Sequence, residues 1–179
     1  NTCIGCNQAC LDNTFAMQLS SCLVNPQASH ETELVYTPVA RKKRIAVVGA
    51  GPAGLSFAVT AAQRGHAVVL VDAGSEIGGQ LNIAKQVPGK EEFYETLRYY
   101  RRQLELHGVE LRLSTRVEAS DLAGQGYDEV VVATGIQPRT PDIKGIAHPK
   151  VLSYLDVLRD KQPVGQRVAI IGAGGIGFD

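Results

Sequence analysis

Apolar residues along the chain fall into short continuous runs and longer periodic stretches, which alternate with each other. A short run of this kind is typical of a parallel strand, because such a strand is covered on both faces. Apolar residues spaced three and four apart in the longer stretches predict amphipathic helices. Strands are therefore expected at 45–48, 67–71, 109–113, 129–133 and 167–171, and helices at 53–64, 91–107 and 154–159.

The alternation of strands and helices predicts an α/β fold with a mostly parallel sheet and helices on both faces. Residues 1–25 do not follow this pattern, because they are cysteine-rich and irregular, and residues 26–43 are polar without clear periodicity. We therefore expect a cysteine-rich segment at 1–25, a linker at 26–43, an α/β domain at 44–150 and the start of a further domain at 151–179.

A glycine-rich turn connects the first predicted strand to the first predicted helix. In a Rossmann-like dinucleotide-binding domain, the first glycine of such a turn permits the tight bend, the second lets the backbone approach a pyrophosphate, and the third lets the helix pack on the strand. The N-terminus of the helix then offers free N–H groups to the phosphates. The candidate binding residues of this G-x-G-x-x-G motif are Gly49, Gly51, Pro52, Ala53 and Gly54.

Asp72 stands at the C-terminal end of the next predicted strand, where a carboxylate can accept hydrogen bonds from both ribose hydroxyls. Its charge would repel a 2′-phosphate, so this site is expected to prefer FAD or NAD over NADP. Two nearby stretches favour flavin. Gly78-Gly79-Gln80 lies in a long glycine-rich loop and would let a bulky ring lie against the backbone, and Ala133-Thr134-Gly135 ends a valine-rich strand beneath the expected crevice.

A second G-x-G-x-x-G motif occupies residues 172–177, directly after the predicted strand at 167–171. Gly172, Gly174 and Gly177 are its candidate nucleotide-binding residues. Two such motifs indicate two nucleotides, with electrons passing between them. The chain begins without an initiator Met and stops inside the helix expected after this motif, so we interpret it as an internal piece of a longer polypeptide.

All the cysteines lie near the start of the chain, at Cys3, Cys6, Cys10 and Cys22, in the pattern C-x2-C-x3-C-x11-C. Iron–sulfur clusters use unequal spacings of this kind, whereas structural zinc sites more often use two separate C-x2-C pairs. A [4Fe–4S] cluster is the favoured interpretation, while zinc, a pair of disulfides and unligated thiols stay open. No signal peptide is recognisable, and the clustering of the thiols favours a reducing, cytoplasmic location.

The charge composition of the chain limits the classes of molecule that it is expected to bind. Lys and Arg together number 18, as do Asp and Glu, so the formal net charge is zero. This balance argues against a general nucleic-acid or membrane-surface role, and no apolar stretch reaches transmembrane length. The basic run at 41–44 is interpreted as a solvated entry to the first strand. The helix predicted at 91–107 carries a stripe of core residues, so the Tyr99-Tyr100 pair within it is interpreted as packing and not as catalytic. No catalytic residue is assigned to the chain.

These features together resemble the two-dinucleotide flavoprotein reductases. The cysteine segment resembles the cluster segment of the 2,4-dienoyl-CoA reductase and trimethylamine dehydrogenase family. Residues 83–102 and 153–158 are similar to bacterial NADPH-dependent 2,4-dienoyl-CoA reductases in particular.

The resemblance implies an oxidoreductase acting on CH–CH bonds. NADPH would give a hydride to FAD, FAD would pass single electrons through the [4Fe–4S] cluster to FMN, and FMN would reduce the dienoyl thioester in fatty acid oxidation. It also implies an FMN barrel before this chain and the rest of an NADPH domain after it, so the chain alone is expected to be inactive. The alternatives are a piece of a trimethylamine dehydrogenase-like flavoprotein and a zinc-stapled nucleotide-binding module without a redox role.

Overall fold

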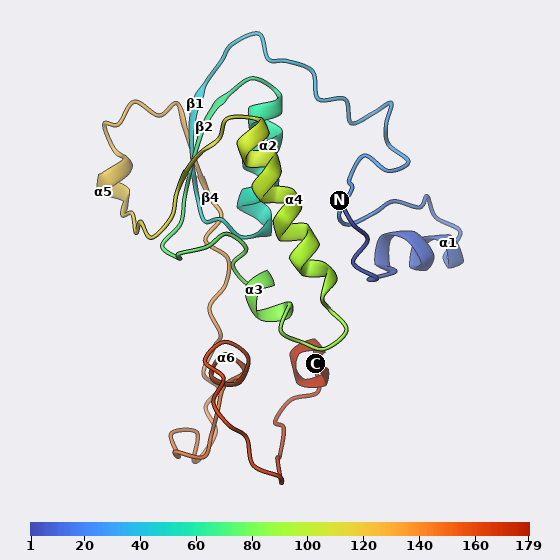
Figure 1. The fold of residues 1–179 in the computed structure, drawn as a ribbon, viewed down its shortest axis with the longest axis vertical. Helices are drawn as coiled ribbons and strands as arrows, with labels where there is room; N and C mark the ends of the chain where they lie inside the picture. The colour runs from blue at the N-terminus through green and yellow to red at the C-terminus, as the bar shows by residue number, and fades with distance from the viewer.

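The computed structural model describes residues 1–179 and contains one four-stranded parallel sheet in the order β3-β2-β1-β4 (Figure 1). The central strand β1 pairs with β2 along its whole length and with β4 on its other side. This arrangement confirms the predicted α/β fold class. The strands are β1 (Arg44–Val48), β2 (Ala67–Val71), β3 (Glu110–Arg112) and β4 (Glu129–Val132).

Two helices cover one face of the sheet, α2 (Pro52–Gln63) and α4 (Glu92–Leu106) (Figure 1). Leu55 of α2 and Leu70 of β2 are completely buried between the helices and the sheet, and Leu104 of α4 is 3% exposed. Burying a leucine side chain stabilises a fold by about 1.5–3 kcal/mol. The predicted core stripe of α4 is therefore confirmed, and the sheet is anchored mainly from this side.

The opposite face of the sheet is covered by the segment that leads from β3 to β4. Ala46, Val69 and Val71 alternate with the residues that face α2, and all three are buried. The covering segment carries α5 (Ala119–Leu122), which lies across the sheet from α2 (Figure 1). Near the end of the covering segment, just before β4, the centroid of the Tyr127 ring lies 4.4 Å from the guanidinium of Arg44 at the start of β1.

Short helices were expected neither in the cysteine segment nor in the long loop at 73–90. The cysteine segment contains a π-helical turn, η1 (Gln8–Asp12), that continues into α1 (Asn13–Phe15), and the loop contains α3 (Leu81–Ala84). No helix in the chain combines the length and the apolar character needed to cross a membrane.

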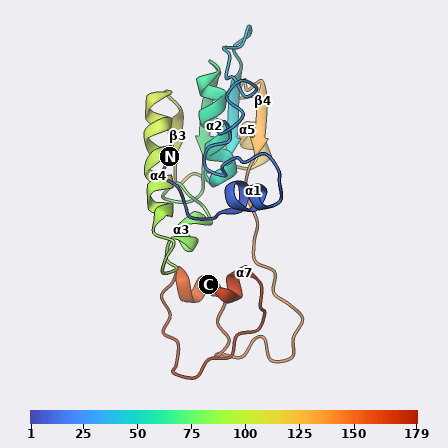
Figure 2. The same cartoon turned by 90° about the vertical axis from the view of Figure 1, so that its right-hand side faces the viewer.

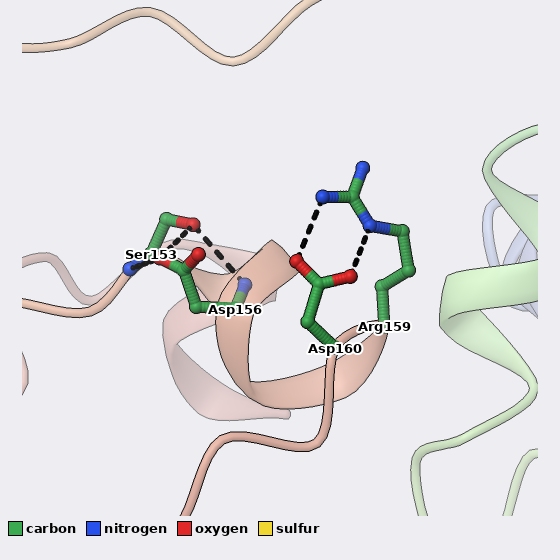
Figure 3. A network of polar contacts seen from close by, with 4 residues as sticks. All are labelled: Ser153, Asp156, Arg159 and Asp160. Atoms are coloured by element: carbon green, nitrogen blue, oxygen red, sulfur yellow. Dashed lines mark hydrogen bonds and ion pairs between the residues drawn. The ribbon is translucent and has the colours of Figure 1, made fainter.

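The C-terminal segment carries α6 (Tyr154–Leu158) and α7 (Gly175–Phe178), which lie beyond α3 from the sheet (Figures 1 and 2). Ser153 and Asp156 cap α6 reciprocally: the Asp156 carboxylate accepts from the Ser153 N–H at 2.7 Å, and the Ser153 hydroxyl accepts from the Asp156 N–H at 3.2 Å (Figure 3). The Ser153 hydroxyl also donates to the Asp156 carboxylate at 2.7 Å, and this bond, followed by that of the Ser153 N–H, holds the pKa of Asp156 below its usual value.

The strand predicted at 167–171 is wrong, because these residues form no strand. Val168, Ile170 and Ile171 are 60%, 69% and 76% exposed. A strand is stabilised by hydrogen bonds to a neighbouring strand, and the sheet contains only β1 to β4. The apolar run at 167–171 therefore has the composition of a buried strand, but no neighbouring strand is present to pair with it.

The junction of β1 and α2 generates a first prediction. A β-carbon on Gly54 would lie 1.8 Å from the Gly49 carbonyl oxygen, so Gly54→Ala must push the helix away from the strand. We expect a loss of about 3 kcal/mol in the free energy of unfolding, measured by chemical denaturation.

Gly51→Ala is the matched control in the same turn. A β-carbon there would meet no heavy atom within 4 Å, and the φ angle of −76° suits any residue. Its cost is expected to stay below about 1 kcal/mol. Equal losses in the two variants would show that close packing at Gly54 does not hold α2 on β1.

Candidate functional site

The first glycine motif lies at the carboxyl edge of the sheet, where α/β proteins bind their ligands. Gly49 has a φ angle of 110°, and a β-carbon there would lie 2.3 Å from the carbonyl oxygen of Ala133. The Gly49 N–H also donates to the Val71 carbonyl at 2.8 Å. Only glycine fits this point, because the ends of β1, β2 and β4 all converge on it.

The start of α2 is open to solvent and has unused hydrogen-bond donors. Gly51 is the N-cap residue, and no side chain caps the helix. The N–H groups of Ala53 and Gly54 have no backbone acceptor. A β-carbon on Gly51 would meet no heavy atom within 4 Å, so the backbone at this point is open to the approach of a ligand. The free donors and the positive end of the helix dipole would favour a pyrophosphate there.

Asp72 lies directly against this glycine loop. One carboxylate oxygen accepts from the Ala50 N–H at 2.5 Å, and the other accepts from the Gly74 N–H at 2.6 Å. These two bonds fix the orientation of the half-buried carboxylate, while each oxygen keeps a further lone pair for a ligand. The position suits the ribose-binding role predicted for Asp72, which stays a prediction.

The turn at residues 78–80 packs on the glycine loop, a contact that sequence reasoning missed. The Gly78 N–H donates to the Ala50 carbonyl at 2.7 Å, and a β-carbon on Gly79 would lie 3.1 Å from the Gly51 α-carbon. Both glycines have positive φ angles, 124° and 51°. They therefore allow two backbone segments to approach each other, and Gln80 follows on the exposed side of the turn.

Asn82 and Lys85 hold this turn in place, and neither was predicted as a site residue. The Asn82 amide donates to the Ile77 carbonyl at 3.0 Å and accepts from the Lys85 ammonium at 2.7 Å. The ammonium lies 5.0 Å from the centroid of the Tyr94 ring on α4, and the Lys85 side chain is only 11% exposed. No sequence signal separates this lysine from an ordinary surface lysine, since its burial depends on the tertiary contact with α4.

The residues after β4 complete the edge of the site. The Ala133 N–H donates to the Val48 carbonyl at 2.8 Å, and the N–H of Thr134 borders Gly49 as well. Gly135 has a φ angle of 73° and open space around it. The structure thus brings Ala133 and Thr134, together with Asp72 and the turn at 78–80, around the glycine loop.

The second glycine motif has the local shape of the first. Gly172 has a φ angle of 115°, close to the 110° of Gly49, and Gly174 caps α7 with an extended backbone, as Gly51 caps α2. A β-carbon on Gly177 would lie 2.3 Å from the Gly172 carbonyl oxygen. The turn therefore forms although the strand before it does not, and it lies apart from the first site.

The cysteine segment does not form a metal site in this structure. The four thiols are free. The Ser21 N–H donates to the Ala9 carbonyl at 2.7 Å, and this bond places the backbone next to Cys22 beside the backbone next to Cys10. The Gly5 N–H is directed at the Cys3 sulfur, 3.3 Å away. No three ligating side chains lie close enough to hold a metal ion.

Ligation by Cys3, Cys6, Cys10 and Cys22 therefore stays a prediction. Four thiols without disulfides are the donor set that an iron–sulfur cluster requires. Metal binding and the final fold of such a segment are generally coupled.

Comparison with known proteins finds relatives among the oxidoreductases. A metal reductase from Desulforamulus reducens is 40% identical over 99% of this chain, which covers 27% of that protein. A cinnamate reductase from Clostridium sporogenes is 34% identical over 99% of this chain, which covers 26% of that protein. The chain thus spans about a quarter of the length of these relatives.

Two solved structures resemble this fold with different degrees of structural similarity. A 2-naphthoyl-CoA reductase bound to 2-naphthoyl-CoA matches 98% of this chain and 27% of its own, with a TM-score of 0.92 and 36% identity. A histamine dehydrogenase from Rhizobium sp. 4-9 matches 90% of this chain and 25% of its own, with a TM-score of 0.76 and 28% identity.

The family model described as pyridine nucleotide-disulphide oxidoreductase matches residues 43–179. This range contains the whole parallel sheet and both glycine motifs. Since most of the chain fits the model, the chain belongs to the pyridine nucleotide-disulphide oxidoreductase family.

Proposed function

We propose that this chain is the FAD-binding, electron-transferring part of an NADPH-dependent 2,4-dienoyl-CoA reductase. The observation that carries the proposal is the convergence of three features at one edge of the sheet. The uncapped start of α2, the fixed carboxylate of Asp72 and the turn at 78–80 all meet at the glycine loop.

Different residues of this site would bind different parts of FAD. The N–H groups of Ala53 and Gly54 would bind the pyrophosphate, and Asp72 would accept from the ribose hydroxyls. Gln80 and Thr134, which follow the two stretches packed on the glycine loop, would contact the rest of the cofactor. Bound FAD would supply the capacity to accept two electrons at once and release them singly.

The resemblance at residues 83–102 and the structural comparison both favour a reductase that acts on a CoA thioester substrate. The solved structure with a TM-score of 0.92 is a 2-naphthoyl-CoA reductase, whereas the histamine dehydrogenase gives 0.76. The reductase also matches more of the chain, including the C-terminal segment. These differences support a CoA thioester over an amine as the substrate of the complete protein.

The cysteine segment and the second glycine motif extend the proposal to the complete protein. Cys3, Cys6, Cys10 and Cys22 would hold a [4Fe–4S] cluster, which carries one electron at a time. The second motif would begin the NADPH site, and an FMN barrel in the same polypeptide would reduce the substrate. In the net reaction, NADPH gives up a hydride and water supplies one further proton, so the dienoyl thioester gains two electrons and two protons.

The first test of this function concerns Asp72. Replacing it with alanine removes the charged acceptor for the ribose, so Asp72→Ala should weaken FAD binding by about 1–3 kcal/mol in titrations of flavin-free protein. Asp72→Asn keeps one oxygen acceptor and should lose less. Glu92→Ala, which removes an exposed carboxylate at the start of α4, is the control for a general loss of charge, and equal weakening by Glu92→Ala would refute the ribose assignment.

The second test concerns the metal. Anaerobically purified or reconstituted complete protein should contain about four iron atoms per chain and no zinc, by elemental analysis. Cys10→Ala and Cys22→Ala should each lower the iron content strongly, because each removes one thiolate ligand. Ser21→Ala changes the neighbouring residue without removing a thiol and should keep the iron. Stoichiometric zinc in place of iron would contradict the cluster.

The third test concerns the substrate. The complete protein should oxidise NADPH when a 2,4-dienoyl-CoA is added and should release the product with one double bond fewer, as detected by mass spectrometry. Trimethylamine and histamine, offered with an artificial electron acceptor, should not be oxidised. Amine oxidation without thioester reduction would instead assign the chain to an amine dehydrogenase.

A further inference from the structure

Residues 78–90 form a segment that contacts the first nucleotide site on one side and the C-terminal segment on the other. Figures 1 and 2 show α3, which belongs to this segment, between the sheet and the pair α6 and α7. The glycine turn at its start packs on the glycine loop through the bond from the Gly78 N–H to the Ala50 carbonyl. Three polar side chains on its other side reach α6, α7 and the loop between them: Gln80, Gln86 and Lys90.

The central contact joins Gln86 to Lys161. The Lys161 ammonium donates to the Gln86 side-chain oxygen at 2.8 Å. The Gln86 amide nitrogen donates to the Asn82 carbonyl at 3.4 Å, which orients the amide oxygen toward Lys161. Lys161 has a φ angle of 55°, a left-handed conformation that is uncommon for a residue with a side chain. A conformation of this kind persists only where its surroundings hold it, and it often marks a functional position.

Two further contacts flank the central one. The Tyr154 hydroxyl at the start of α6 donates to the Gln80 side-chain oxygen at 3.4 Å. At the other end, the Lys90 ammonium pairs with the Asp179 carboxylate beside α7. The three contacts thus connect the start, the middle and the end of the segment 78–90 to the stretch that carries the second glycine motif.

The chain connection alone would not fix this placement. Residues 133–153, which lead from β4 to α6, contain no helix or strand and are almost all exposed. The placement of the C-terminal segment is nevertheless shared with a solved relative, since the TM-score of 0.92 applies to 98% of the chain. Side-chain contacts with residues 78–90 therefore contribute to the orientation.

We propose that residues 78–90 are the positioning surface that aligns the second nucleotide site with the flavin site, and that Gln86 and Lys161 are its central positioning residues. The proposal rests on the proposed function, because it concerns hydride transfer between two bound nucleotides. The reacting atoms must lie about 3–3.5 Å apart, and a misplacement of about 1 Å lowers the rate by roughly 100-fold. The segment touches both sites and can set this distance.

The experiment compares Gln86→Leu and Lys161→Gly in the complete protein. Glycine adopts the left-handed conformation freely, so Lys161→Gly removes the ammonium without adding backbone strain. Each variant should speed hydrogen–deuterium exchange in residues 151–163 of the flavin-free protein. Each should also lower the limiting rate of FAD reduction at saturating NADPH by about tenfold, with the Kd for FAD unchanged within about twofold.

The control and the rescue separate positioning from general destabilisation. Lys150→Met removes an exposed ammonium that makes no contact with residues 78–90 and should change neither measurement. The double variant Gln86→Lys with Lys161→Gln exchanges donor and acceptor, so it should recover most of the lost reduction rate.

Two results would overturn the proposal: unchanged exchange together with an unchanged reduction rate, or a loss of FAD affinity equal to the loss of rate. If the unmodified protein binds no FAD or is not reduced by NADPH, the proposed function fails instead. The exchange measurement on the flavin-free protein then decides the positioning role alone, with unchanged exchange overturning it.

Discussion

The close approach of α2 to β1 at Gly49 and Gly54 is the constraint on which the rest of the nucleotide site depends. It allows no β-carbon at either position, and it places the first N–H groups of α2 at the edge of the sheet. The same turn presents the Ala50 N–H to Asp72 and the Ala50 carbonyl to Gly78. One tight junction therefore sets the phosphate-binding donors, the ribose acceptor and the neighbouring turn relative to each other.

Much of this arrangement could be predicted from the sequence, because it follows from rules about parallel sheets. Continuous apolar runs gave the strands β1 and β2, and carboxyl ends of parallel strands meet at one edge. Asp72 and the glycine loop were therefore expected together. The packing of Gly78 and Gly79 on the loop was not predictable, since positive φ angles suit either a bound ring or a backbone contact. The burial of Lys85 likewise depends on Tyr94, a residue of another element.

The sequence expectation that the structure does not realise has a physical cause. A strand at 167–171 needs a partner from outside the local sequence, a neighbouring strand that shares its hydrogen bonds. The turn at Gly172 forms without its strand, because the contact between Gly177 and Gly172 lies within a few residues. A constraint within a few residues, or one that follows from the rules of parallel sheets, can therefore be predicted from the sequence, whereas a contact that depends on one particular distant segment cannot.

The contacts between residues 78–90 and the C-terminal segment have a character that suits alignment more than rigid attachment. They are polar and mostly exposed, such as those of Gln86 with Lys161 and Gln80 with Tyr154. A hydrogen bond of this kind contributes about 0.5–1.5 kcal/mol, far less than the buried core that holds α2 and α4 on the sheet. Directional bonds of modest strength fix an orientation while leaving the interface free to separate, and two nucleotides that must bind, react and leave require both properties.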